Sequence, residues 1–190
     1  LKDPFACRDE RCLSRAGLIA DFVGRPHDPR ELVSRVNRAV NGLVAYRSDR
    51  DGYGKLDYWA GPRETLMRGY GDCEDFAMLK MAVLASRGID PRDMSLVVLR
   101  DRSRQVYHAV LAVRLAGENL VLDNLDRAVR RDTELAHYQP LFSVSAGKGS
   151  IHGWRTGRAP GAMASLGTLA SIAPGEGFAL PDERPEPAER

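Results

Sequence analysis

The sequence lacks the features that mark several functional classes. It has no run of five or more Lys or Arg, and aromatic residues make up only 7% of its 190 residues. A nucleic-acid-binding surface needs clustered positive charge, often interleaved with aromatic rings. The net charge of +2 does not supply such a cluster. We therefore expect no nucleic acid among its partners.

The sequence also lacks a hydrophobic run long enough for a transmembrane helix, which needs about 20 apolar residues. Its longest uncharged stretch, 159–175, is interrupted by Pro and Gly and is rich in Ala, Gly and Ser. No internal repeat is present. The length predicts one domain with a substantial hydrophobic core.

Cysteine is scarce, and the count is odd: Cys7, Cys12 and Cys73. A disulfide between Cys7 and Cys12 would leave Cys73 free and would indicate an oxidising compartment. The alternative is a pair of ordinary surface thiols. The chain begins at Leu1 rather than Met, and the removal of an upstream export signal would agree with the first interpretation.

Helix signals divide the N-terminal half of the chain. The segment 28–44 begins with an Asp-Pro pair, followed by a Glu three residues after the Asp, and then has apolar residues at helical spacing. These features predict an amphipathic helix. The segment 47–54 is rich in Ser, Asp and Gly and predicts a loop. Pro62 is expected to open a short helix that Gly69 ends.

A longer helix is predicted from about Cys73 to Arg87, with Gly88 at its C-cap. It is apolar on nearly every face, which is typical of a buried central helix. The period of the apolar residues then changes to two, in three segments separated by turn-like residues: 95–99, 107–115 and 119–123. Three antiparallel strands are expected there. Helices followed by strands predict an α+β domain in which the buried helix packs on an antiparallel sheet.

The pattern weakens after Asp126. The segment 141–144 is compatible with a final strand, and Trp154 is expected to cap the core. From 156 onward Gly, Ala, Pro and Ser dominate, a composition that buries too little apolar surface to offset the entropy of ordering. We expect a single domain over 1–155 and a flexible tail over 156–190.

The acidic segment Gly71-Asp72-Cys73-Glu74-Asp75 contains an electrostatic conflict. At the start of a buried helix, free amide N–H groups and the helix dipole favour a reactive thiolate. Three carboxylates beside that thiol raise its pKa and favour the inert form. In the simplest interpretation, Asp72 caps the helix and the other two acids complement its dipole.

A bound Ca2+ would resolve this conflict, because hard oxygen ligands suit it and its charge offsets that of the carboxylates. We expect Asp72 and Glu74 to be its main ligands, followed by Asp75. Asp49 and Asp51 could contribute, although solvated loop acids are the more ordinary interpretation. The twelve-residue EF-hand pattern is absent from this loop.

A cysteine nucleophile needs a base near it and a third group that orients the base. His108 lies on the middle predicted strand, and Asp123 ends the next one. Adjacent antiparallel strands bring such positions side by side, and a helix that begins at the sheet edge would add the thiol of Cys73. The sequence therefore predicts a Cys73–His108–Asp123 triad.

The same residues resemble those of a known family. Five segments are similar to the bacterial transglutaminase-like cysteine proteinases. They are Tyr58-Trp59-Ala60, Glu64-Thr65-Leu66, Gly71 to Ala77, His108 to Ala112 and Leu122 to Leu125. The resemblance covers roughly 32–154. It implies a papain-like, transglutaminase-type fold with Cys73 as nucleophile, His108 as base and Asp123 as the orienting residue.

The resemblance implies a calcium-dependent cysteine endopeptidase of the periplasm. Proteases of this kind cleave large surface adhesins near their N-terminus and release biofilm cells, and an inner-membrane receptor for cyclic-di-GMP restrains them. Two alternatives keep the same residues. One is a transglutaminase or amide-transfer enzyme in which an amine replaces water, and the other is a calcium-dependent binding protein that does not cut its partner.

Overall fold

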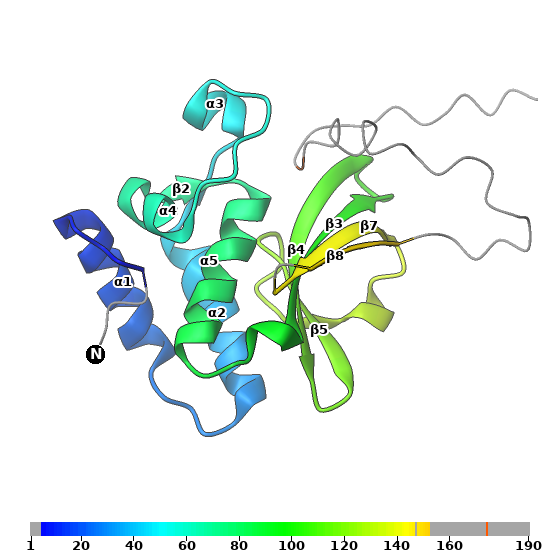
Figure 1. Ribbon diagram of the computed structural model, residues 1–190, viewed down its shortest axis with the longest axis horizontal. Helices are drawn as coiled ribbons and strands as arrows, with labels where there is room; N and C mark the ends of the chain where they lie inside the picture. Colours follow the sequence, from blue (N-terminus) through cyan, green and yellow to red (C-terminus); the bar gives the residue numbers. More distant parts are fainter. Residues whose placement is uncertain (1–4, 147, 153–173, 175–190) are drawn as a thin grey trace, which may run out of the picture.

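The computed structural model describes residues 5–146, 148–152 and 174. A layer of helices lies on one side of an antiparallel sheet, and the helix α5 (Cys73–Ser86) lies between the other helices and the strands (Figure 1). The remaining helices are α1 (Glu10–Val23), α2 (Pro29–Leu43), α3 (Asp49–Tyr53) and α4 (Pro62–Arg68). Short 3-10 turns occupy Pro91–Asp93 and Asp132–Glu134.

The sheet has six strands in the order β6-β5-β4-β3-β7-β8. Their bounds are β3 (Met94–Asp101), β4 (Val106–Leu115), β5 (Glu118–Leu122), β6 (Arg130–Arg131), β7 (Tyr138–Ser145) and β8 (Lys148–Ile151). All neighbouring pairs are antiparallel. A separate pair of two-residue parallel strands, β1 (Ala45–Tyr46) and β2 (Tyr70–Gly71), lies ahead of α5.

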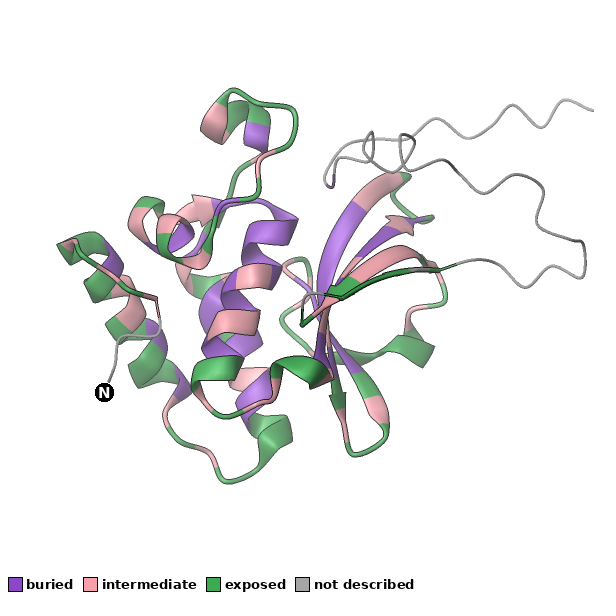
Figure 2. Ribbon diagram, in the orientation of Figure 1, coloured by how far each residue is buried: buried purple, intermediate pink, exposed green. Residues whose placement is uncertain are grey.

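The predicted central helix is buried along most of its length, and Figure 2 shows this burial together with that of the inner strands. α5 packs on β4 on one side and on α2 and α4 on the other. These contacts on both sides explain why the sequence of α5 is apolar on nearly every face, because a helix inside a core exposes little surface to solvent. The α+β arrangement expected from the sequence is therefore the observed one.

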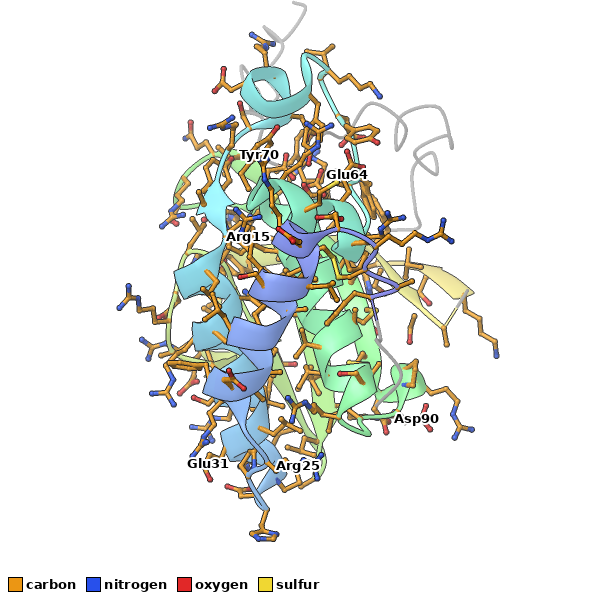
Figure 3. All side chains as sticks on the ribbon, turned by 90° about the vertical axis from the view of Figure 1, so that its left-hand side faces the viewer. Arg15, Arg25, Glu31, Glu64, Tyr70 and Asp90 are labelled. Atoms are coloured by element: carbon orange, nitrogen blue, oxygen red, sulfur yellow. A yellow bond between two sulfur atoms is a disulfide. The ribbon has the colours of Figure 1, made fainter. Side chains whose placement is uncertain are left out.

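The helix α1 covers the outer side of the helical layer and was not predicted. Its N-terminal signal is Asp9, whose carboxylate accepts the backbone N–H of Cys12 at 2.9 Å. Arg15, which is labelled in Figure 3, connects α1 to the end of α4. Its guanidinium donates to the backbone carbonyls of Leu66 at 2.7 Å and of Met67 at 2.9 Å. A disulfide joins Cys7 to Cys12, with Cα atoms 5.5 Å apart, as the first of the two interpretations expected.

Several local predictions differ from the structure. The expected loop at 47–54 contains the short helix α3, because Ser48 accepts the N–H of Asp51 as an N-cap and Gly54 ends the turn at a φ of 65°. The predicted C-cap is displaced by one residue: Arg87 caps α5, and Gly88 follows with a φ of 95°.

At the C-terminal end, the strand expected at 141–144 is longer, and a further strand, β8, follows it. The predicted positions of Trp154 and of the tail at 156–190 lie outside the described residues, apart from Pro174. Within the part of the chain that the structure describes, no helix combines the length and the apolar character that crossing a membrane requires.

Candidate active site

The short strands ahead of α5 determine where Cys73 lies. β1 pairs with β2 so that Tyr46 is opposite Gly71, and β2 leads into the helix through Asp72. A Cβ atom on Gly71 would lie only 2.5 Å from Oδ2 of Asp75, so no other side chain fits without a shift. The glycine of the acidic segment is therefore required by close packing against the first turn of the helix.

Cys73 is the first residue of α5 and is only 2% exposed. Its thiol donates to Oε2 of Glu74 at 3.2 Å and also lies within hydrogen-bonding reach of the backbone N–H of Ala109. Burial, together with the charges of Glu74 and Asp72, raises the pKa of the Cys73 thiol well above its ordinary value. The electrostatic conflict expected from the sequence is thus present in the folded chain.

His108 and Asp123 are hydrogen-bonded to each other. His108 lies near the start of β4, and Asp123 directly follows β5, the antiparallel neighbour of β4. Nε2 of His108 lies 2.9 Å from Oδ1 of Asp123, and the two residues are only 3% and 5% exposed. Burial alone would raise the pKa of Asp123, but hydrogen bonding and the charge of His108 hold that pKa at about 2.

Cys73 lies next to the strand that carries His108. The thiol of Cys73 approaches the backbone of Ala109, which is the residue after His108 on β4. The structure therefore joins the imidazole to the carboxylate by a hydrogen bond and places the thiol beside the neighbour of His108 in the chain. Their catalytic roles stay predictions.

A group of three buried carboxylates lies beside the thiol. One oxygen from each of Asp49, Asp72 and Glu74 lies within 4.8 Å of the others, and all three residues are buried. Asp49 is only 3% exposed, so the expectation of a solvated loop acid is wrong for it. The helix α3, which begins at Asp49, turns this carboxylate toward the start of α5, and the sequence contained no long-range signal of that approach.

The two other acids considered from the sequence lie differently. Asp75 is buried, but its Oδ1 accepts the backbone N–H of Ala60 at 2.7 Å, and it does not belong to the three-carboxylate group. Burial raises the pKa of Asp75 to about 8. Asp51 accepts the hydroxyl of Ser48 at 2.9 Å in an exposed turn. The carboxylate that lies close to Asp72 and Glu74 is thus that of Asp49 and not that of Asp75.

The three-carboxylate group fits a divalent cation. Oδ1 of Asp49, Oδ1 of Asp72 and Oε1 of Glu74 are buried acceptors, and none has a hydrogen-bond partner among the described residues. Burial raises the pKa values of all three carboxyl groups, and the charge of Glu74 adds to the rise at Asp72. Buried acidic oxygens without donors are costly unless a cation or protons compensate them.

Asp72 also shows why the simplest interpretation of these acids is incomplete. It occupies the N-cap position of α5, but its side chain makes no capping hydrogen bond. Its carboxylate instead belongs to the group formed with Asp49 and Glu74. The predicted capping position is correct, whereas the side chain is free for another ligand.

Aromatic side chains also lie around this end of the molecule. Burial and the nearby charges of Cys73 and Asp72 raise the pKa of Tyr46 to about 12. Trp59 is 38% exposed. Tyr138 donates its hydroxyl to Asp123, a contact for which the sequence offered no signal because it depends on how the strands are ordered.

The sequence profile of the bacterial transglutaminase-like cysteine proteinases matches residues 7–148. A comparison with curated protein sequences found no match. The family match covers both the helical layer and most of the sheet, including every residue of the site described above.

Solved structures of Legionella pneumophila LapG share the fold. One aligns with a TM-score of 0.65 and 23% identity over 76% of this chain and 81% of that chain. A calcium-bound structure aligns at 0.64 and 23% over 86% and 90%. An EGTA-treated structure aligns at 0.62 and 25% over 84% of each chain. The predicted transglutaminase-type fold class is confirmed.

Proposed function

The chain belongs to the bacterial transglutaminase-like cysteine proteinases, and from this premise we propose that it is a calcium-dependent endopeptidase with a Cys73–His108–Asp123 triad. The single observation that best supports the triad is the buried hydrogen bond between His108 and Asp123. A carboxylate that accepts from one ring nitrogen fixes the imidazole, so that the other nitrogen is directed to a nucleophile.

In the proposed mechanism, the sulfur of Cys73 attacks the scissile carbonyl, and His108 takes the thiol proton. His108 then gives that proton to the leaving amine, and water hydrolyses the thioester. Asp123 holds the imidazole in one orientation throughout. The backbone N–H of Cys73 is suited to the oxyanion, because the first N–H groups of a helix have no partner within the helix.

We propose that Asp49, Asp72 and Glu74 hold the calcium ion. Bound there, Ca2+ would offset two of the three negative charges beside the thiol. Glu74 connects the two sites, because its Oε2 accepts the thiol of Cys73 while its Oε1 is without a partner among the described residues. The fold shared with a calcium-bound structure of LapG supports this assignment.

The proposed substrate is an exported or surface protein, such as a large biofilm adhesin, and the proposed location is the periplasm. The family resemblance suggests both, and the disulfide between Cys7 and Cys12 agrees with an oxidising compartment. On the same basis, an inner-membrane receptor for cyclic-di-GMP is the proposed regulator. We also propose that the peptidase domain spans 1–155.

The direct test is to incubate the protein with large exported adhesins from its own source, with calcium and with excess EGTA. We expect a calcium-dependent fragment whose N-terminal sequence gives the cut site. The variant Cys73→Ala should bind but not cut. Unchanged cleavage in EGTA would contradict the calcium assignment, and cleavage by Cys73→Ala would contradict the nucleophile.

The same assay separates hydrolysis from amide transfer. An amine donor added to the reaction competes with water for the acyl group on the thiol. Stable incorporation of the amine into the substrate, in place of a cut chain, would support the transferase alternative and overturn the endopeptidase proposal.

A further inference from the structure

Asp123 has hydrogen-bond partners at both carboxylate oxygens. Oδ1 accepts Nε2 of His108 and the backbone N–H of Leu125, each at 2.9 Å. Oδ2 accepts the hydroxyl of Tyr138 at 2.5 Å. A carboxylate held at one oxygen can still rotate about its Cβ–Cγ bond, whereas donors at both oxygens fix its plane.

Tyr138 comes from a distant part of the sheet. It is the first residue of β7, where it pairs with Asp101 of β3, while Asp123 follows β5. In the sheet order, β4 and β3 lie between β5 and β7. The hydrogen bond between Tyr138 and Asp123 therefore connects the end of β5 with the start of β7, next to His108.

The ring of Tyr138 also contacts the imidazole directly. The rings of His108 and Tyr138 meet edge to face, with centroids 5.9 Å apart and planes at 69°. His137 packs on the Tyr138 ring at 4.5 Å. One side chain thus packs against the proposed base and holds the carboxylate that orients this base, so the imidazole, the carboxylate and the phenol form one connected unit.

The surroundings of Tyr138 keep its hydroxyl a donor. Burial and the hydrogen bond to Asp123 raise the pKa of Tyr138 above its ordinary value, and the charge of Asp101 acts in the same direction while that of Arg104 opposes it. Two further charged groups act on Asp123, namely Lys80 from α5 and Asp126. The phenol therefore stays protonated over the whole range in which a cysteine peptidase works.

A cavity of about 220 Å³ borders the same hydrogen bond, and its lining includes Asp123, Tyr138 and His137. The space is large enough for water beside the carboxylate of Asp123, and His108 is not among the residues that line it. Without the phenol, water would reach Oδ2 and solvate it in variable positions. The hydroxyl of Tyr138 occupies this place instead and donates to Oδ2 from a fixed position.

We propose that Tyr138 is a positioning residue of the peptidase, which holds Asp123 in the plane that orients His108 toward Cys73. The inference rests on the proposed triad and extends it by a fourth side chain. Tyr138 does not touch the reacting atoms. Its hydroxyl acts through Asp123, and removal of the hydroxyl therefore matters only where Asp123 is present.

The test uses iodoacetamide, because Cys73 is the one free cysteine of the chain, and its alkylation rate reports the activated thiol without any knowledge of the substrate. The rate constant is measured in excess calcium for the wild type, Tyr138→Phe, Asp123→Ala and the double variant. We expect Tyr138→Phe to slow alkylation by about tenfold, since water from the cavity replaces part of the lost hydrogen bond. In the Asp123→Ala background the same substitution should change the rate less than twofold.

The matched control is Tyr58→Phe. It also removes a hydrogen bond from a phenol to a carboxylate, because the hydroxyl of Tyr58 donates to Oε2 of Glu64 at 3.1 Å, and this bond does not involve Asp123. This control should alkylate at the wild-type rate. Thermal unfolding of each variant identifies any loss of structure, and Tyr138→Phe retains the ring that packs on His108.

The outcomes separate the inference from the proposed function. A wild-type rate for Tyr138→Phe, together with a slow rate for Asp123→Ala, would overturn the positioning role and leave the triad intact. Equal slowing by Tyr138→Phe in both backgrounds would also overturn it, because the effect would not pass through Asp123. A wild-type rate for Asp123→Ala would instead contradict the triad itself.

Discussion

Gly71 shows how one residue controls the entry to the site. The hypothetical Cβ atom at this position is 2.6 Å from Cβ of Asp75 and 2.5 Å from its Oδ2. Asp75 cannot withdraw easily, since its other oxygen accepts the N–H of Ala60 inside the core. The backbone between β2 and α5 can therefore approach the helix only with a glycine at this position.

The first prediction concerns this close approach. Gly71→Ala should displace the turn that carries Cys73, and we expect a loss of about 2 kcal/mol in the free energy of unfolding together with most of the activity. Urea unfolding and the cleavage assay measure the two effects. The control is Gly42→Ala in α2, where the new methyl group meets nothing within 4 Å. It should stabilise the helix slightly, and equal effects of both variants would contradict the steric explanation.

The second prediction separates Asp49 from Asp51, two acids of one short helix. Asp49 is buried and contributes an oxygen to the group with Asp72 and Glu74, whereas Asp51 faces solvent and is bonded to Ser48. Asp49→Asn removes one charged ligand and should weaken calcium binding by at least about tenfold, as measured by calorimetric titration. Asp51→Asn should bind like the wild type. The reverse order of affinities would place the ion elsewhere.

At the scale of the element, α5 holds groups of opposite charge in one buried helix. Its first turn carries Glu74 and Asp75, and Lys80 lies about two turns further on with 0% exposure. Nζ of Lys80 has no hydrogen-bond partner among the described residues, and the ring of Phe76 lies 5.8 Å from it. An ammonium group in such a place is costly, because neither water nor an adjacent carboxylate solvates it.

The third prediction follows from this buried cation. Burial lowers the pKa of Lys80 to about 7, against the weaker opposing effect of Asp123. The folded state therefore binds fewer protons than the unfolded state between pH 7 and the ordinary lysine value, and its stability rises with pH over that interval. Lys80→Met should raise the free energy of unfolding by roughly 1–4 kcal/mol below pH 7.

The advantage of Lys80→Met should decrease as the pH rises from 7 and should level off above about 10.5, where the wild-type lysine is largely neutral in both states. Urea unfolding at several pH values measures the difference. Lys55→Met serves as the control, because Lys55 is exposed and lies over the ring of Tyr58 at 3.8 Å. A variant Lys80→Met that is less stable than the wild type at pH 6 would contradict the prediction.

At the scale of the whole molecule, the proposed calcium site joins segments that are distant in the sequence. Asp49 belongs to α3, and Asp72 and Glu74 lie at the start of α5, which is the helix that connects the helical layer with the sheet. A cation bound there would link the outer helices to the core. Its binding should therefore stabilise the entire fold rather than one loop.

The fourth prediction is a calcium-dependent unfolding temperature. A ligand that binds only the folded state stabilises it by about 2.7 kcal/mol at a hundred times its dissociation constant. For a chain of this size we expect the midpoint to rise by roughly 5–10 °C, as measured by calorimetry. Magnesium should produce a smaller shift, because it dehydrates reluctantly. A smaller calcium-induced rise of the midpoint in Asp49→Asn and a normal rise in Asp51→Asn would support the ligand set. A wild-type midpoint that does not change with calcium would contradict the site.

The success of the sequence-based predictions depended on whether the signal was local. The start of α2 at an Asp-Pro pair, the apolar helix α5 and the strands β3 to β5 were predicted correctly, since caps and periodicity lie within each segment. The order of His108 and Asp123 on neighbouring strands also followed from the short turn between β4 and β5. Predictions were weaker where polar residues form compact turns, as in α3.

The sequence by itself determined the helix that begins at Cys73, the alternation of the strands and the family, because hydrophobic period, capping residues and motif order are properties of contiguous chain. Only the tertiary structure decided that Asp49, and not Asp75, joins Asp72 and Glu74, and that Tyr138 reaches Asp123. Both contacts connect residues whose separation in the sequence carries no periodic signal. They arise when α5 is fixed between the helical layer and the sheet, and the order of the strands then determines which side chains meet.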